Sequence, residues 1–286
     1  MFKQRLLTAL VLAPLALAAV FYLPQQGFAL FLAAAFLVAA WEWAAFCGWH
    51  TPVQRSSFVL GTGLWYALCY QVLPANLYWP TQTNDAAETA IWTGIIWWLI
   101  AVLMVLSFQR SQRFWADVRI LKVTMGWLTL VPSFAALLLL RNVNYQQSEF
   151  TGAWLICCLL GLVWAADIGG YVIGKPFGKH KLLPSVSPGK TIEGLGGGLG
   201  FVLLFVTAVA GYLQWPDGFL LWYFAAIILT LLAVFGDLSE SMFKRVAGLK
   251  DSGSIFPGHG GILDRLDSLT ATAPLFALFV ALFGGF

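Results

Sequence analysis

The chain has 286 residues, of which 60% are hydrophobic and only 10% are charged, and its mean hydropathy is +0.80. Because a soluble domain carries roughly a quarter charged residues, this composition excludes a soluble globular protein. A disordered chain is excluded by the high apolar content, and a disulfide scaffold is excluded because there are only four cysteines. The formal net charge of +3 says less than the places where the charges lie. The remaining class is a polytopic membrane protein.

Apolar segments long enough to cross a bilayer recur along the whole chain, since a spanning helix needs roughly 20 mostly apolar residues. The first segment can also be interpreted as a cleaved signal peptide, because Lys3 and Arg5 precede an apolar run. We expect helices 1–5 within residues 1–150 and helices 6–9, with the functional loops, within residues 151–286. The sequence therefore predicts an all-α bundle of about nine transmembrane helices, over 6–23, 28–46, 57–73, 90–108, 124–140, 153–173, 195–213, 219–236 and 268–285.

Basic residues alternate from loop to loop. All of the 16 Lys and Arg residues except Arg141 fall at the N-terminus or in every second loop. The intervening loops carry few charges, such as Asp85 and Glu88. Cytoplasmic loops are enriched in Lys and Arg, so the pattern predicts a cytoplasmic N-terminus and a C-terminus on the outside.

Charged groups within or beside apolar spans are costly, so each is a functional candidate. Asp167 lies inside the sixth predicted span, Asp237 ends the eighth, and Asp264 and Asp267 precede the ninth. In the predicted topology all four lie toward the cytoplasmic side, where they can share one layer. Glu42 also lies near this layer, but no polar cluster surrounds it in the sequence, which favours a structural role.

The spacing of the acidic residues suggests their chemistry. Asp264 and Asp267 are three residues apart, which would place both carboxylates on one face of a helix. Asp-rich oxygen sites suit Mg²⁺, and such sites recruit substrate phosphates as further ligands. The alternative is that the carboxylates pair with neighbouring Lys and Arg side chains and only hold the bundle together.

Several loop residues have the character of phosphate ligands. Four cations lie within about 20 residues of one another, where they would repel each other unless anions join them; they are Lys244, Arg245, Lys250 and Arg265. The segment 187–194 resembles a helix start, with Ser187 or Thr191 as a cap and Lys190 near free N–H groups.

Two further features lie close to the acidic residues. The glycine-rich turn that contains Gly260 and Gly261 could aim N–H groups at a phosphate, or it could simply join two helices. His259 in this turn could be a base, a metal ligand or only a turn residue. Ser241 would lie on the same helical face as Asp237.

The stretch from Ser241 to Asp267 reads SMFKRVAGLKDSGSIFPGHGGILDRLD. It resembles the signature of the phosphatidate cytidylyltransferases, also called CDP-diacylglycerol synthases, at every fixed position. The upstream Asp167 and the Ser-Pro-Gly-Lys-Thr segment resemble the family as well, although position 189 is Gly where some members have Lys. The first 150 residues resemble it only in hydropathy.

The resemblance implies a bacterial inner-membrane enzyme that transfers CMP from CTP to phosphatidic acid and requires Mg²⁺. It places metal and catalytic positions on Asp237, Lys244, Asp264 and Asp267. We expect Asp167 to join the metal site, with a second cation as an open alternative, and Arg265 to neutralise phosphate oxygens during catalysis. Substrate phosphates are expected to meet Ser187, Lys190, Ser241, Arg245, Lys250, His259, Gly260 and Gly261. Membrane lipid is the expected surrounding, a homodimer is suggested by the family alone, and nucleic acid is not an expected partner.

Two other functions remain open from the sequence. A cation- or proton-coupled transporter would also bury carboxylates in a helix bundle, but it predicts acids near the bilayer midplane and an inverted repeat, which we do not find. Another membrane transferase acting on lipid phosphates could use a similar metal site, and its consumption of CTP would separate the two enzymes.

Overall fold

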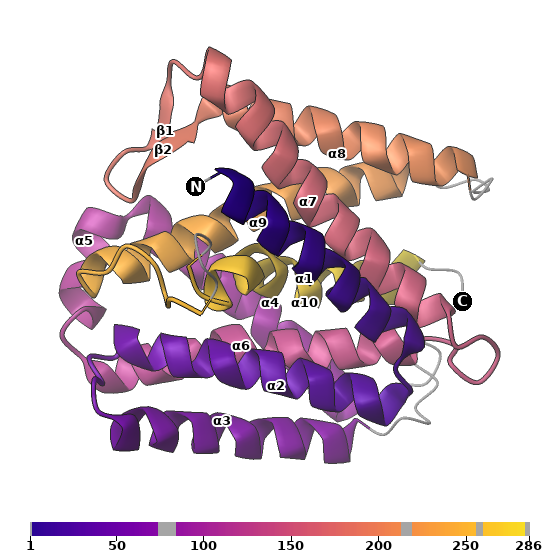
Figure 1. The fold of residues 1–286 in the computed structure, drawn as a ribbon, viewed down its shortest axis with the longest axis horizontal. Helices are drawn as coiled ribbons and strands as arrows, with labels where there is room; N and C mark the ends of the chain where they lie inside the picture. Colours follow the sequence, from indigo (N-terminus) through magenta and orange to yellow (C-terminus); the bar gives the residue numbers. More distant parts are fainter. Residues whose placement is uncertain (1, 74–83, 213–218, 256–259, 284–286) are drawn as a thin grey trace.

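The computed structural model describes residues 2–73, 84–212, 219–255 and 260–283, which form ten helices and one two-stranded hairpin (Figure 1). The helices of the first half are α1 (Phe2–Tyr22), α2 (Gln25–Phe46), α3 (Pro52–Val72), α4 (Asp85–Leu106), α5 (Phe108–Trp115) and α6 (Arg119–Asn142). The second half contains α7 (Thr151–Phe177), β1 (Lys181–Leu183), β2 (Ser187–Thr191), α8 (Ile192–Tyr212), α9 (Phe219–Val246) and α10 (Leu263–Phe283).

Each of the nine predicted spans corresponds to one long helix, and α5 is an additional short helix between α4 and α6. Seven helices in the described part of the chain, namely α2, α4 and α6–α10, are long and apolar enough to cross a membrane. The remaining two long helices are not among these seven. The apolar part of α1, Leu10–Tyr22, is shorter, and α3 is not a candidate. The all-α membrane bundle is therefore confirmed, whereas the count of nine spans and the orientation stay predictions.

Helix α6 forms the centre of the bundle, with 72% of its most apolar stretch buried, and it packs against α2, α3, α4 and α10. Aromatic rings fill the space around it. Phe134 of α6 stacks on Tyr66 of α3 with ring centroids 4.2 Å apart, and Phe36 of α2 meets both rings edge-on. Such large apolar contacts fix the order of these helices.

Helices α7 and α8 approach each other closely because glycines face each other along their interface. A Cβ atom on Gly197 would lie 2.6 Å from the carbonyl oxygen of Gly169, closer than a side chain tolerates. Cβ atoms on Gly194 and Gly198 would also meet carbonyl oxygens of α7, at 3.0 and 2.9 Å, so these glycines allow the close helix packing. Together α7 and α8 form one wall of the site described below.

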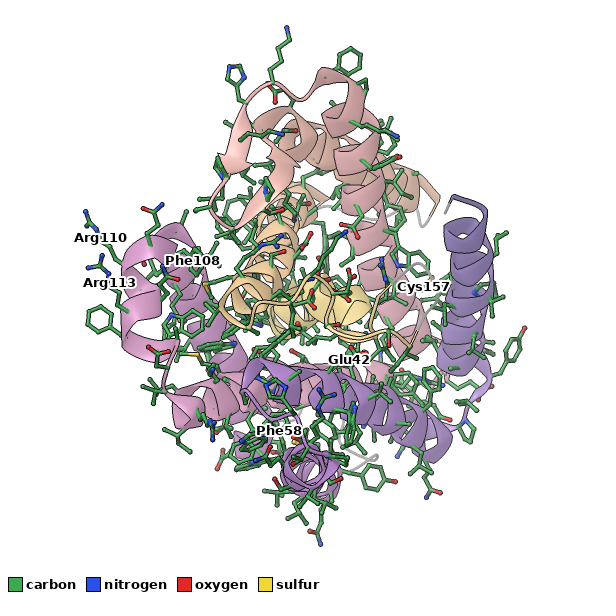
Figure 2. The ribbon with its side chains drawn as sticks, turned by 60° about the vertical axis from the view of Figure 1, so that its left-hand side comes forward. Glu42, Phe58, Phe108, Arg110, Arg113 and Cys157 are labelled. Atoms are coloured by element: carbon green, nitrogen blue, oxygen red, sulfur yellow. The ribbon has the colours of Figure 1, made fainter. Side chains whose placement is uncertain are left out.

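The helix connections gather at two opposite ends of the bundle (Figure 1). The connection between α2 and α3, helix α5, the β1–β2 hairpin and the described part of the α9–α10 connection lie toward the left of the view. The connections α1–α2 and α6–α7 lie at the right. The predicted alternation of basic loops therefore corresponds to a real separation in space, and Figure 2 shows Arg110 and Arg113 of α5 pointing outward at the first end.

The predicted helix start at 187–194 is partly wrong. Ser187 belongs to β2, which pairs antiparallel with β1, and the helix begins only at Ile192. Of the two candidate caps, Thr191 is the one observed, since its Oγ1 accepts a hydrogen bond from the N–H of Gly194 at 3.1 Å. The consequence is that Lys190 stands on a hairpin strand and reaches toward α9.

Candidate active site

A cavity of about 530 Å³ lies between α7, the hairpin, α8 and α9. We call it the central cavity. Three of the predicted site residues line it from three different elements, namely Asp167 of α7, Lys190 of β2 and Asp237 of α9. Lys175 and Tyr171 of α7 line it too, and the remaining wall is made of small or apolar residues: Ala166, Gly170, Gly174, Leu182, Gly189, Thr191, Gly194, Leu195, Gly198 and Val234. The cavity thus combines a charged end with an apolar wall.

Lys190 is held against α9 by two contacts. Its Nζ lies 2.8 Å from Oδ2 of Asp237 and donates a hydrogen bond to the carbonyl oxygen of Val234 at 3.2 Å. The other oxygen of Asp237, Oδ1, accepts a hydrogen bond from Oγ of Ser241 at 3.3 Å. The prediction that Lys190, Asp237 and Ser241 belong to one site is consistent with this geometry.

Three predicted metal ligands, each on a different helix, interact electrostatically. Asp167 interacts electrostatically with Asp237 and Lys190, and Asp267 of α10 interacts with both of these aspartates and with Lys190. Helices α9 and α10 approach closely at this level, because Gly236 packs on the backbone of α10 at Asp267 and Ser268. The three carboxylates therefore influence one another electrostatically across three helices.

Asp264 faces a different set of partners. Its Oδ1 lies 2.6 Å from Nζ of Lys244, and its Oδ2 accepts hydrogen bonds from the N–H of Gly261 at 2.7 Å and from Ser252 N and Oγ at 3.1 and 2.9 Å. These protein donors occupy both oxygens. Asp264 is thereby held by protein donors, and its predicted role as a metal ligand beside Asp267 stays a prediction.

Lys244 links this second group to α9. Its Nζ also lies 3.1 Å from Oε2 of Glu240, a side chain that is only 3% exposed. The other carboxylate oxygen, Oε1 of Glu240, is buried and has no hydrogen-bond partner in the described structure. The sequence analysis missed Glu240, although its position, three residues after Asp237 and four before Lys244, would place it on their face of the helix.

The charge balance of the site favours a bound cation. Among the described residues, five carboxylates interact with three cations, Lys190, Lys244 and Arg265; the carboxylates are those of Asp167, Asp237, Glu240, Asp264 and Asp267. Within the described ranges, no group of three or more His, Cys, Asp or Glu side chains is arranged to hold a metal ion by itself. The orphaned oxygen of Glu240 and the excess of oxygen donors nevertheless fit a hard divalent cation that completes its shell with substrate oxygens.

The surroundings of Glu42 differ from the prediction that it has no polar cluster nearby. It lies in the interior of the protein (Figure 2), is 2% exposed and accepts three hydrogen bonds, from Ser252 Oγ at 3.0 Å and from the N–H groups of Ile262 and Leu263 at 3.1 and 2.8 Å. A polar cluster does surround it. The only signal in the sequence was a charge within an apolar span, because its partners lie 210 to 221 residues further along the chain.

The other predicted residues that the structure describes do not line the central cavity. Arg245 donates a hydrogen bond from Nε to the carbonyl oxygen of Val186 at 3.2 Å and lines a second cavity of about 480 Å³ together with His50 and Lys122. Lys250 is exposed, Ser187 is half-buried, and Gly260 has a positive φ of 76°. Arg265 interacts with Asp167, and His259 lies outside the described residues. The substrate-binding roles of these residues stay predictions.

Comparison with known proteins identifies the family of this chain. The profile described as "Cytidylyltransferase family" matches residues 3–283. The chain is 42% identical to the phosphatidate cytidylyltransferase of Pseudomonas aeruginosa over 278 residues, 97% of this chain and 96% of that protein. It is 37% identical to that of Haemophilus influenzae over 287 residues, 98% of each chain, and 46% identical to that of Synechocystis over 132 residues, 46% of this chain and 45% of that protein. With relatives this similar over nearly its whole length, the chain belongs to the phosphatidate cytidylyltransferase family.

Proposed function

We propose that this multi-pass membrane protein transfers CMP from CTP to phosphatidic acid and thereby forms CDP-diacylglycerol and pyrophosphate. Family membership supports this activity and leaves the transporter considered from the sequence without support. One structural observation carries the location of the reaction. Asp167, Lys190 and Asp237 line a single cavity from three elements, and Asp267 interacts with all three.

The reaction is a displacement at the α-phosphorus of CTP. An oxygen of the lipid phosphate forms the new P–O bond, the bond to the bridging oxygen breaks, and pyrophosphate leaves with the electron pair. The second pKa of a phosphomonoester is about 6, so the attacking phosphate is already largely ionised at neutral pH. No side chain is needed as a general base. The obstacle is repulsion between two polyanions, which cationic side chains and positioning overcome.

The lysines of the central cavity suit this task. Lys190 lies at the charged end, in contact with Asp237, and Lys175 bonds through Nζ to the hydroxyl of Tyr171 at 2.9 Å. We assign the lipid phosphate to Lys190 and Lys175, because the apolar wall beside them, which includes Leu182, Leu195 and Val234, suits the glycerol and the first part of the acyl chains. Lys244 and Arg265 are assigned to the developing charge on pyrophosphate.

Mg²⁺ would be held by Asp167, Asp237 and Asp267, with Glu240 close by through its free oxygen. When bound, such an ion neutralises phosphate oxygens and helps to align the two substrates. In this assignment Asp264 acts as a positioning residue that keeps Lys244 in place, because its Oδ1 lies 2.6 Å from Nζ of Lys244. The site would open to the inner leaflet of a bacterial cytoplasmic membrane.

The test uses purified full-length protein in nanodiscs of phosphatidylcholine, supplied with CTP and phosphatidic acid. CDP-diacylglycerol measured by mass spectrometry and released pyrophosphate should appear in equal amounts, and neither should form after EDTA treatment. Asp237→Asn should lower turnover about 100-fold, whereas the exposed Asp85→Asn on α4 serves as the matched control. A folded protein that forms no CDP-diacylglycerol would refute the activity, and full turnover by Asp237→Asn would refute the site.

A further inference from the structure

Glu42 connects two parts of the protein that are remote in sequence. It stands on α2, near the end of an apolar helix, and its carboxylate reaches the first residues of α10 (Figure 2). Oε1 accepts the N–H of Ile262, and Oε2 accepts the N–H of Leu263 together with Oγ of Ser252. Both carboxylate oxygens of buried Glu42 therefore accept hydrogen bonds from successive backbone N–H groups at the start of α10.

These contacts act as a helix cap supplied by another helix. The first N–H groups of a helix have no partner within the helix, and a side-chain oxygen placed there stabilises it. A negative charge is favoured further by the positive end of the helix dipole. Because the carboxylate binds two successive amides, it fixes the position of the α10 start relative to α2 and not only its helical conformation.

The same loop also holds Asp264. Oγ of Ser252 lies 3.0 Å from Oε2 of Glu42 and 2.9 Å from Oδ2 of Asp264, and a hydroxyl has a single proton to donate. The N–H groups of Ser252 and Gly261 donate to Asp264 as well. The loop is closed tightly around both acids, since a Cβ atom on Gly253 or Gly261 would collide with the Glu42 carboxylate.

We propose that Glu42 is a positioning residue for the reaction, which fixes the α10 start so that Asp264 reaches Lys244 and Asp267 faces Asp237. This inference rests on the proposed function, because it presumes that the reaction uses these α9 and α10 residues. Glu42 is outside the 241–267 signature and does not line the central cavity. Its effect reaches the site through the backbone of residues 261–263.

The experiment compares Glu42→Gln and Glu42→Ala with Glu88→Gln, which makes the same chemical change at an exposed position on α4. Hydrogen–deuterium exchange is measured at the amides of Ile262 and Leu263, together with kcat per folded protein and the Mg²⁺ concentration that gives half the maximal rate. We expect faster exchange at both amides and a fall in kcat of about 10- to 100-fold, because small displacements of reacting groups have effects of that size. Glu42→Gln retains one acceptor and should be less impaired than Glu42→Ala, and more Mg²⁺ should be needed by both.

Each result has a defined meaning. Unchanged exchange at Ile262 and Leu263 would refute the cap, and faster exchange with wild-type kcat and Mg²⁺ dependence would refute the positioning role. If Asp264→Asn and Asp267→Asn kept full turnover while Glu42→Gln lost it, the site assignment of the proposed function would be wrong instead. If the Glu42 variants did not fold, Ser252→Ala decides, since it removes only the bridging hydroxyl. It should speed exchange at the same amides and lower kcat severalfold, and unchanged values would overturn the proposal.

Discussion

The ammonium nitrogen of Lys190 lies 2.8 Å from Oδ2 of Asp237, which joins a hairpin strand to the last third of α9. The hairpin itself is short, with three residues in β1 and five in β2. Thr191, the residue after Lys190, pairs with Lys181 across the hairpin and caps α8. The position of this cation in the central cavity is therefore set by the strand pairing, the helix cap and the ion pair together.

Replacing this lysine should disable the site without unfolding the protein. Lys190→Met keeps the length of the side chain and removes the charge, so the lipid phosphate loses its nearest cation and Asp237 loses its partner. We expect kcat/KM for phosphatidic acid to fall about 100-fold, equivalent to about 3 kcal/mol. Lys181→Met, an exposed lysine of the same hairpin, is the control and should retain wild-type kinetics. Equal losses in both variants would contradict a specific role for Lys190.

Asp264 and Asp267 should respond to the same substitution in opposite ways. Asp264 accepts bonds from Lys244, Ser252 and Gly261, so Asp264→Asn breaks a buried pair and should cost about 3 kcal/mol of folding stability. Asp267 faces two other carboxylates, so Asp267→Asn relieves repulsion and should leave Tm unchanged or higher while turnover is lost. Thermal unfolding in detergent and CDP-diacylglycerol formation measure the two effects. A lower Tm for Asp267→Asn would show that its carboxylate is structurally required.

The glycine interface between α7 and α8 gives a prediction about stability alone. Gly197→Ala places a methyl group against the side chain of Ile173 and the carbonyl oxygen of Gly169, so overpacking should cost about 1–3 kcal/mol. At Gly196 there is no atom within 4 Å of the added methyl group. Gly196→Ala should therefore be neutral or stabilising by up to about 1 kcal/mol, since alanine favours the helix. Thermal unfolding of both variants decides, and equal Tm values would contradict the close approach.

The predicted orientation can be tested with single cysteines at the two ends of the bundle. Gly189 of β2 and Ser148 between α6 and α7 are both exposed. The β1–β2 hairpin and the α6–α7 connection lie at opposite ends of the bundle (Figure 1). In intact cells a membrane-impermeant maleimide should label Ser148→Cys but reach Gly189→Cys only after lysis. The four native cysteines are buried or half-buried, and the unsubstituted protein measures their background. Labelling of Gly189→Cys from outside would reverse the topology.

Much of the fold was predictable because helix formation in a membrane protein depends on local apolar length. Within the described residues, a helix forms over each of the nine predicted segments. The hairpin was not predicted, since Ser-Pro-Gly-Lys-Thr has no strand pattern. The hairpin also forms contacts with α9, from Lys190 to Asp237 and from Arg245 to Val186. These contacts join residues that are distant in the chain, so local sequence patterns could not predict them.

The sequence predicted which residues belong to the candidate site better than it predicted how they are arranged. Asp167 and Asp237 were found because charges in apolar spans are rare, and Lys190 was found at a predicted helix start; all three line the central cavity. The partners of Asp264 were not predictable, because they depend on where the helix begins, at Leu263, which leaves Asp264 within reach of loop donors. Glu42 was undervalued because its partners are in the last fifth of the chain.

Polar contacts hold the β1–β2 hairpin region against α9. Lys190 forms an ion pair with Asp237 and a hydrogen bond to Val234, and Arg245 donates a hydrogen bond to Val186. An ammonium or guanidinium group can exchange a protein oxygen for a phosphate or water oxygen with little net change in free energy, whereas separated apolar surfaces would gain no new partner. A phosphate anion can therefore compete for Lys190 and Arg245 and replace their contacts between the hairpin and α9. The apolar helix interfaces deeper in the bundle can stay packed while this happens.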